Sequence, residues 1–194
     1  RKKRIHPQKD DKVLTDWNGL MISAFSQSAK ALNQEKYLKI AQKAADFCLS
    51  ELRQKNGRLL KRWRRGKAGL PAHLEDYAFL SQGLLDLYEA SFKVKYLQAA
   101  IELVDLTRKH FEDTGNGGFF LTADDGEKLL IRAKEIYDGA IPSGNSVMAL
   151  NLLRVHKITG QEKYLNSAEN LFSAFSGFLE KSPQGAEVLL HALD

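Results

Sequence analysis

The chain has 194 residues, of which 43% are hydrophobic, and it contains only 4 Pro and 14 Gly, so its composition excludes a disordered chain and favours an ordered globular domain. No apolar run reaches the roughly 20 residues that a membrane-spanning helix needs, and no hydrophobic stretch follows the charged N-terminus as it would in a signal peptide. The single cysteine, Cys48, excludes an internal disulfide, and with the lack of a signal peptide it favours a cytoplasmic protein.

The formal charge of +5 is concentrated in two clusters, Arg1 to Arg4 and Arg58 to Lys67. Binding to a phosphate backbone would need these clusters to form one continuous face, and no nucleic-acid-binding motif accompanies them. We therefore expect no nucleic-acid partner. The abrupt charged start and the helix-like ending suggest a fragment of a longer protein.

Three similar segments begin at residues 37, 96 and 164, so that successive copies are 59 and 68 residues apart. Their apolar residues follow the i, i+4, i+7, i+8 spacing of an amphipathic helix. The same offsets identify a second, upstream helix in each copy. Short turns join the two helices of each pair, so we expect three antiparallel hairpins, at about 16–52, 75–111 and 143–179, with the start of a further helix at 183–194.

The upstream helix of each pair is poor in charge, whereas its partner carries Lys, Glu and Arg on one side. A helix that is apolar on most sides is buried, so we expect the upstream helices to form an inner ring and their partners an outer one. The period is too long for tetratricopeptide-type repeats. The sequence therefore predicts an all-α fold, a single domain over residues 1–194 that forms about half of an α/α toroid.

Two connectors, 53–74 and 112–142, exceed the roughly 12 to 15 residues above which structureless loops become uncommon. An Asp-Gly pair between apolar runs predicts a β-hairpin in the second connector, and the first connector has a similar signal around LLKRWRR. Because each hairpin is antiparallel, both connectors must lie at the pole where the inner helices begin.

The repeat offsets also align the starts of the inner helices. Asp16, Glu75 and Ser143 are equivalent, and the next two positions are occupied by Trp17 and Asn18, Asp76 and Tyr77, and Gly144 and Asn145. Asp and Ser are favoured helix N-caps, which is a purely structural explanation for either residue alone. Capping does not explain the accompanying amides and aromatic rings, to which the connectors add Trp63, Tyr137 and Asp138.

Carboxylates, amides and flat rings that line a concave surface suit sugar recognition, because hydroxyl groups need polar partners and pyranose faces stack on rings. Hydrolysis of a glycosidic bond needs two carboxyl groups, which two of Asp16, Glu75, Asp76 and Asp138 can supply. Epimerisation instead needs a base beside a ring carbon, and His73 is best placed for that role.

Arg64 beside Trp63 could bind an anionic substituent of the ligand, although a solvated loop explains the same residues. No metal-ligand spacing and no glycine-rich phosphate loop is present in the sequence, so we expect neither a metal nor a cofactor.

The segments DDKVLTDWNGLMI at 10–22, LEDYAFL at 74–80 and DGAIPSGNS at 138–146 resemble the C-terminal region of the YyaL-type, spermatogenesis-associated, thioredoxin-fused proteins. The resemblance implies an (α/α)6 toroid similar to six-hairpin glycosidases and N-acylglucosamine 2-epimerases, preceded in the longer protein by a thioredoxin-like domain. The positions that match the family motifs are Asp16, Trp17, Asn18, Glu75, Asp76, Tyr77, Asp138, Ser143, Gly144 and Asn145.

Two hypotheses about function follow. The chain is either a carbohydrate-active domain, acting as a hydrolase or an epimerase, or a non-enzymatic module that presents substrate proteins to the thioredoxin-like domain. A sugar pocket should be narrow with paired polar groups, whereas a protein-binding rim should expose an apolar patch. Half a ring also leaves inner helices unburied at its edges, so we expect copies of the chain to associate.

Overall fold

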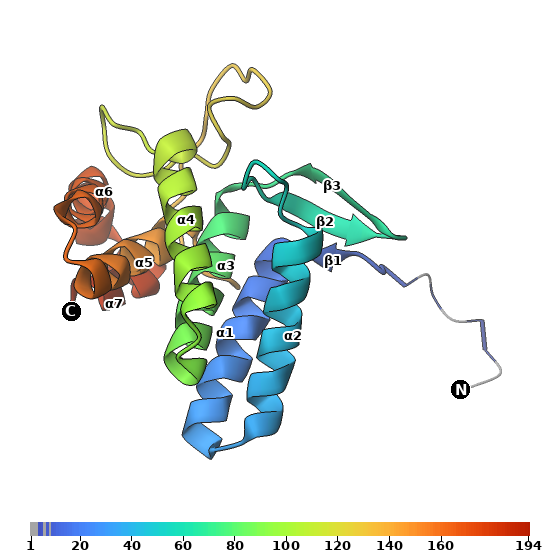
Figure 1. The fold of residues 1–194 in the computed structure, drawn as a ribbon. Helices are drawn as coiled ribbons and strands as arrows, with labels where there is room; N and C mark the ends of the chain where they lie inside the picture. The colour runs from blue at the N-terminus through green and yellow to red at the C-terminus, as the bar shows by residue number, and fades with distance from the viewer. Residues whose placement is uncertain (1–3, 6, 8) are drawn as a thin grey trace.

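The computed structural model describes residues 4, 5, 7 and 9–194, so His6 and most of the first basic cluster lie outside the described residues (Figure 1). The helices are α1 (Thr15–Leu32), α2 (Glu35–Glu51), α3 (Leu74–Ser91), α4 (Val94–Phe111), α5 (Gly144–Thr159), α6 (Glu162–Lys181) and α7 (Glu187–Leu193). A 3-10 turn, Pro183–Gly185, precedes α7. The strands are β1 (Val13–Leu14), β2 (Leu60–Arg64) and β3 (Lys67–Pro71).

The helical hairpins confirm the sequence repeat down to their turns. The inner helices α1, α3 and α5 are followed by the C-cap residues Asn33, Phe92 and Gly160, and each of these residues adopts the left-handed conformation that commonly ends a helix. These positions are separated by the same 59 and 68 residues as the repeat. The three turns are therefore equivalent in conformation, although only one of them uses the glycine that this conformation favours.

Helix α3 lies at the centre of the structure and packs against α1, α4 and α5. Most of its residues are buried, as expected for an inner helix. Helices α1 and α3 approach most closely at two glycines, where a methyl group added at Gly19 would lie 2.4 Å from the carbonyl carbon of Phe79 and one added at Gly83 would lie 2.5 Å from the carbonyl oxygen of Gly19. Only glycine permits this contact between two helix backbones.

Helix α1 is buried on the side that contains Gly19, Ile22 and Ser26, but it leaves Trp17 and Met21 exposed by 59% and 50%. This open edge is what half a ring predicts. In the outer helix α2, Cys48 is fully buried, and burial raises the pKa of its thiol to about 12, so the side chain packs as a small hydrophobe. No helix within the described part of the chain is long and apolar enough to span a bilayer.

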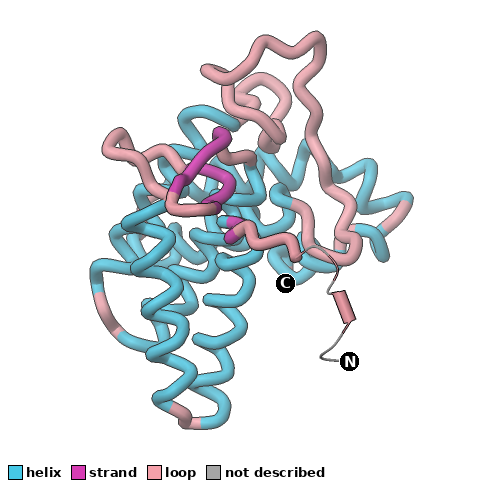
Figure 2. Tube along the Cα trace, turned by 90° about the vertical axis from the view of Figure 1, so that its right-hand side faces the viewer, coloured by secondary structure: helices cyan, strands magenta, loops and turns pink. Residues whose placement is uncertain are grey.

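Strands β1, β2 and β3 form an antiparallel sheet in that order, with Val13 opposite Trp63 and Arg62 opposite Gly69. The hairpin of β2 and β3 confirms the prediction for the first connector, whereas the pairing of β1 was not predicted. The sheet lies at the end of the helices opposite the turns of the first two hairpins, beside the long second connector (Figures 1 and 2).

The β-hairpin predicted in the second connector is wrong. Asp125 and Gly126 lie in a turn, but no strand forms between residues 119 and 141. Leu121 N–H does donate to Ala133 O across the predicted hairpin, but the neighbouring groups bond elsewhere, because Phe120 N–H donates to Phe111 O and Leu74 N–H donates to Leu121 O. The connector is instead held as an irregular loop against the ends of α3 and α4.

Candidate functional site

The leading ends of the inner helices meet at one pole, as the repeat predicts. The backbone N–H of Asp16 in α1 donates to the Oδ1 of Asp76 in α3, with 3.1 Å between the two atoms. A methyl group added at Gly144 in α5 would lie 2.8 Å from the side chain of Leu74 and 3.4 Å from the backbone nitrogen of Glu75. Residues as far apart in sequence as Asp16 and Gly144 therefore meet at the start of α3.

Two of the predicted carboxylates share a lysine that the β-hairpin supplies. Lys61 Nζ in β2 lies 3.1 Å from Asp16 Oδ2 and 3.3 Å from Asp76 Oδ2. Burial lowers the pKa of Lys61, but the charges of Asp76 and Asp16 more than offset this effect, so its pKa lies above the ordinary value. We call Asp16, Lys61, His73, Glu75 and Asp76 the carboxylate cluster.

Asp76 is the structural centre of this cluster. Its side chain is fully buried, and besides Lys61 and Asp16 N–H it accepts a bond of 2.8 Å from the backbone N–H of His73. Burial raises the pKa of Asp76 to about 7, although Lys61 and the His73 N–H act in the opposite direction. A carboxyl group without exposed surface cannot touch a ligand in this conformation, so the geometry gives Asp76 a positioning role in place of the catalytic role expected for it.

Glu75 and His73 lie on the outer side of the same helix start, and both are half-buried. No side chain among the described residues hydrogen-bonds to the Glu75 carboxylate. Burial raises the pKa of Glu75, whereas burial and then the charge of Lys61 lower the pKa of His73. Glu75 is therefore a carboxyl group that keeps its proton to higher pH than usual, beside an imidazole that stays neutral to lower pH than usual.

Two predicted ligand-binding residues are fully buried and serve the fold. The hydroxyl oxygen of Tyr77 accepts bonds from Leu59 N–H at 2.9 Å and from Arg58 Nε at 3.1 Å, which fixes the first connector. The amide of Asn145 accepts a bond from Phe119 N–H at 2.7 Å and donates to the carbonyl oxygens of Phe119 and Glu135, which fixes the second. Both side chains are fully buried. Each one bonds to backbone groups of a connector that would otherwise be buried without a partner.

Ser143 and Asp138 also have structural positions. Ser143 is the N-cap of α5, and its hydroxyl accepts a bond from Ser146 N–H at 3.0 Å. Asp138 accepts bonds from Ser143 N–H at 2.7 Å and from Val188 N–H at 2.9 Å, so it joins the starts of α5 and α7. The capping explanation therefore holds for Ser143, whereas Asp16 lies inside α1 and does not cap it.

The remaining predicted residues differ in how they face the pole. Trp17 is exposed, and Asn18 is half-buried and donates its amide to Leu14 O at 2.7 Å. Trp63 packs edge-on against Phe47 of α2, with 5.6 Å between ring centroids. Arg64 forms an ion pair with Asp11. Of these four residues, Trp17 alone presents most of its side chain to a ligand at the start of α1.

Three of the six basic residues in the second basic cluster already form ion pairs. Within it, Arg58 pairs with Asp125, Lys61 with the two aspartates of the carboxylate cluster, and Arg64 with Asp11. These ion pairs leave fewer charges for a phosphate backbone than the sequence alone indicates.

A cavity of about 490 Å³ lies next to the carboxylate cluster, between the first connector, the end of β3 and the second connector. Lys61 and His73 belong to both the cavity wall and the cluster. The rest of the wall combines leucine side chains with polar groups of the connectors. The volume lies within the roughly 300 to 1,000 Å³ of ordinary small-molecule sites.

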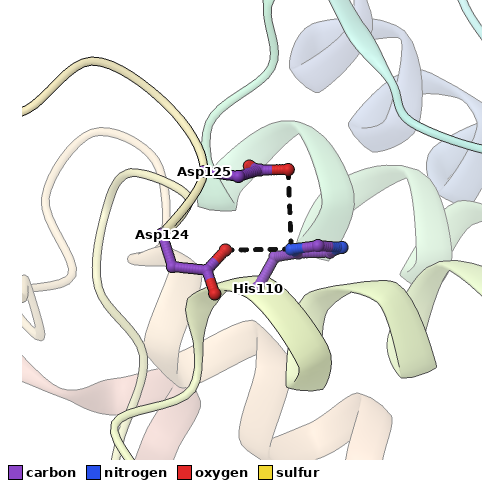
Figure 3. Close-up of side chains that lie close together, drawn as sticks. All are labelled: His110, Asp124 and Asp125. Atoms are coloured by element: carbon purple, nitrogen blue, oxygen red, sulfur yellow. Dashed lines mark hydrogen bonds and ion pairs between the residues drawn. The ribbon is translucent and has the colours of Figure 1, made fainter.

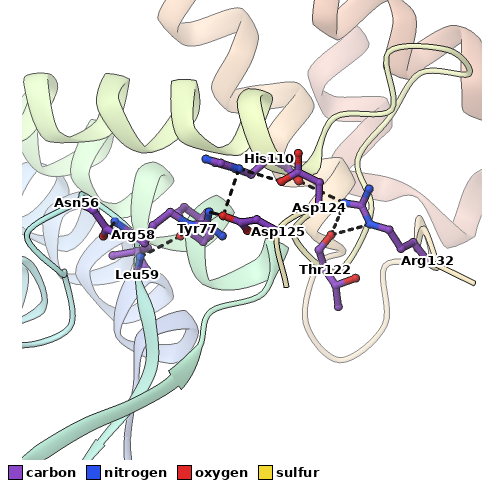
Figure 4. A network of polar contacts seen from close by, with 9 residues as sticks. All are labelled: Asn56, Arg58, Leu59, Tyr77, His110, Thr122, Asp124, Asp125 and Arg132. Atoms are coloured by element: carbon purple, nitrogen blue, oxygen red, sulfur yellow. Dashed lines mark hydrogen bonds and ion pairs between the residues drawn. The ribbon is translucent and has the colours of Figure 1, made fainter. Parts of the chain in front are cut away.

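On the far side of this cavity, His110, Asp124 and Asp125 bring their ligand-type atoms within 4.8 Å of one another (Figure 3). His110 Nδ1 lies 2.9 Å from Asp124 Oδ1 and 3.7 Å from Asp125 Oδ2. That same Asp125 oxygen is 2.6 Å from Arg58 Nη1, so a cation would have to displace a guanidinium group (Figure 4). The three residues act as a polar clamp between α4 and the two connectors.

Sequence reasoning missed Lys61 as a member of the site. The signal was its position on a strand of the predicted hairpin that returns to the pole, but strand register decides which of Lys61, Arg62 and Arg64 faces the helices. The sequence does not determine that register.

No protein-family profile matches the sequence. The chain is homologous to spermatogenesis-associated protein 20 from Homo sapiens, with 38% identity over all of this chain, and to an uncharacterised Caenorhabditis elegans protein, with 35% identity over 94% of this chain. It spans 26% of the length of each relative. These matches confirm the resemblance to the spermatogenesis-associated family that the sequence motifs indicated.

Solved structures with the same fold include a GH76 α-mannanase from Bacteroides thetaiotaomicron, with a TM-score of 0.67 at 22% identity, and a cellobiose 2-epimerase from Spirochaeta thermophila, with a TM-score of 0.70 at 18% identity. The match covers 88% and 87% of this chain but only 47% and 44% of theirs. A third is an inactive α-1,6-mannanase from Salegentibacter, with two successive aspartates replaced by asparagine, in complex with α-1,6-mannotriose. The fold is therefore that of an (α/α)6 toroid, of which this chain supplies about half.

Proposed function

We propose, from the homology with spermatogenesis-associated protein 20 and from the toroid fold, that the chain binds a sugar or sugar-like ligand at the pole where α1, α3 and α5 begin. The observation that carries the proposal is the convergence of Asp16 and Asp76, from two different hairpins, on Lys61, with Glu75 adjacent to Asp76 in α3. Glycosidases and sugar epimerases share this fold, and in the inactive mannanase the replaced aspartates are successive, as Glu75 and Asp76 are here.

Asp16, which keeps 8% of its surface exposed, and the half-buried Glu75 suit different roles. Glu75 has a pKa raised by burial, which suits a general acid that protonates a leaving oxygen. Asp16 Oδ2 lies 3.1 Å from Lys61 Nζ, which fixes the position of this carboxylate as a candidate base or nucleophile. Asp76 holds Lys61 and the backbone of α1 in place. Trp17, exposed beside Asp16, offers a ring on which a sugar face can stack.

Hydrolysis and epimerisation both fit these groups. Hydrolysis uses Glu75 with Asp16, whereas epimerisation uses the neutral His73 imidazole as the base beside a ring carbon. The two reactions are distinguished by their products, because hydrolysis releases a reducing sugar and epimerisation changes one stereocentre without cleavage.

The test is calorimetric titration of the chain with α-1,6-mannotriose and with cellobiose, followed by analysis of the products. Glu75→Gln and Asp16→Asn should weaken binding or abolish turnover while helix content stays unchanged. Glu169→Gln is the matched control, because Glu169 is exposed on α6, far from the pole in sequence. Equal affinities in all four proteins would refute the proposed site.

The alternative is a non-enzymatic module that presents substrate proteins to a thioredoxin-like domain of the longer protein. It is favoured by the apolar tip of the second connector, where Leu130 and Ile131 are exposed by 105% and 83%. In that case Leu130→Ser with Ile131→Ser should abolish binding of unfolded substrate protein, whereas Glu75→Gln should leave it unchanged.

Association between copies remains a proposal for the open edge of α1, where Trp17 and Met21 are exposed. Light scattering should show a dimer at micromolar concentration that Met21→Lys dissociates. A monomer throughout that range would contradict it.

A further inference from the structure

The cavity beside the carboxylate cluster has an apolar mouth. Leu70 at the end of β3 and Leu129 in the second connector line it, and they are exposed by 56% and 46%. Further in, the wall includes Leu59, which is buried, and Leu60, which is half-buried. Exposed leucines at the opening of a cavity are unfavourable in water unless another apolar group covers them.

The backbone holds one of these leucines in an unusual conformation. Leu70 has a φ of 63°, in the left-handed region that side chains larger than glycine rarely adopt. The next residue, Pro71, ends the strand and pairs with Leu60. Strain of this kind persists where the surrounding structure over-determines it, and it is concentrated at ligand-binding sites.

The cationic groups of the cavity wall are already paired. Arg58 is bonded to Asp125 and to the Tyr77 hydroxyl, as Figure 4 shows, and Lys61 is bonded to Asp16 and Asp76. No other lysine or arginine belongs to the wall within the described part of the chain. An anionic ligand would have to compete with these ion pairs, so the cavity suits an uncharged group.

The cavity and the carboxylate cluster are continuous through two residues. Lys61 lines the cavity and its Nζ atom contacts both aspartates, and His73 lines the cavity and its backbone N–H donates to Asp76. A ligand that contacts the cluster can therefore extend into the cavity without crossing a helix.

We propose that this cavity binds the apolar aglycone of a glycoside whose sugar ring contacts Asp16 and Glu75. The inference rests on the proposed function and adds to it the class of substrate: an alkyl or aryl glycoside, with the apolar group between Leu70 and Leu129. The ion pairs in the cavity wall are compatible with both parts of such a ligand, because the carboxylate cluster binds the sugar ring and the leucines bind the aglycone.

The test compares methyl α-D-mannopyranoside with octyl α-D-mannopyranoside, below the concentration at which the octyl compound forms micelles, by calorimetric titration of the chain. We expect the octyl glycoside to bind at least tenfold more tightly, which corresponds to the burial of about two methylene groups. Leu129→Ser should remove this advantage. Leu130→Ser is the matched control, because Leu130 is a more exposed neighbour that does not line the cavity.

The outcomes separate the inference from the proposed function. Equal binding of both glycosides, with loss of both in Glu75→Gln, would overturn the inference and leave the sugar site intact. An octyl advantage that Leu129→Ser and Leu130→Ser reduce equally would show non-specific adsorption and would also overturn it. Binding of neither glycoside would overturn the proposed function and the inference with it.

Discussion

The contact between α1 and α3 gives the sharpest prediction about how the pole is built. In Gly19→Ala the new methyl carbon would lie 2.4 Å from Phe79 C and 2.5 Å from Leu80 N, whereas ordinary contacts begin at 3.4 Å. The two helices must therefore separate by about 1 Å, because a helix backbone cannot rotate away as a side chain can. The separation also moves Asp16 away from Asp76.

The magnitude follows from two opposing effects. Overpacking at a well-packed contact costs about 3 kcal/mol at the upper end of its usual range. Replacing a helical glycine by alanine stabilises by about 1 kcal/mol. We expect Gly19→Ala to lower the free energy of unfolding by about 2 kcal/mol, measured by urea denaturation followed by circular dichroism.

Gly177→Ala is the matched control for this experiment. Gly177 lies in α6 with no atom within 4 Å of the added methyl group, so its replacement should stabilise the chain by about 0.5 to 1 kcal/mol. If Gly19→Ala is as stable as Gly177→Ala, the two helices do not meet backbone to backbone and the reasoning is wrong.

Three further predictions concern the cluster and its support. The free energy of unfolding should fall as pH rises from about 4 to 7. Folding raises the pKa of Asp76 from 3.8 to about 7, so the folded state holds that proton more tightly than the unfolded state does. Urea titrations at each pH measure this fall, and Asp76→Asn should remove it. Lys61→Met should destabilise by about 3 kcal/mol at pH 8, where Asp76 is ionised, and by less at pH 5, where Asp76 is protonated; equal losses would contradict the pairing. Asn145→Ala should cost about 2 to 3 kcal/mol in thermal or urea unfolding, because it leaves the buried Phe119 N–H without a partner, and an unchanged midpoint would contradict that bond.

The helices were predictable because the same apolar pattern occurs three times, so each helix assignment in one copy can be checked against the other two. A single apolar stripe leaves helix boundaries uncertain by several residues, but three stripes with common offsets fix both the hairpins and their turns. The same offsets placed Asp16 beside the start of α3, where the structure has it bonded to Asp76. The third copy deviates, since α5 begins at Gly144 and Ser143 therefore caps it, whereas Asp16 and Glu75 lie inside their helices.

The connectors were less predictable, because their conformations depend on contacts between distant residues. The Asp-Gly pair in the second connector signals a hairpin only if the flanking backbone is free, and Asn145, 26 positions from Phe119, takes those backbone groups instead. Likewise, the composition at the start of α3 does not reveal that Tyr77 faces inward while Glu75 faces outward. That difference separates structural residues from candidate site residues.

The most direct test of the central claim is an amide-resolved NMR titration of the chain with α-1,6-mannotriose. The account predicts that the amide signals at the starts of α1, α3 and α5 shift together with one dissociation constant, and that Glu75→Gln removes the response. Shifts confined to the opposite ends of these helices, or no shift at saturating trisaccharide, would contradict it.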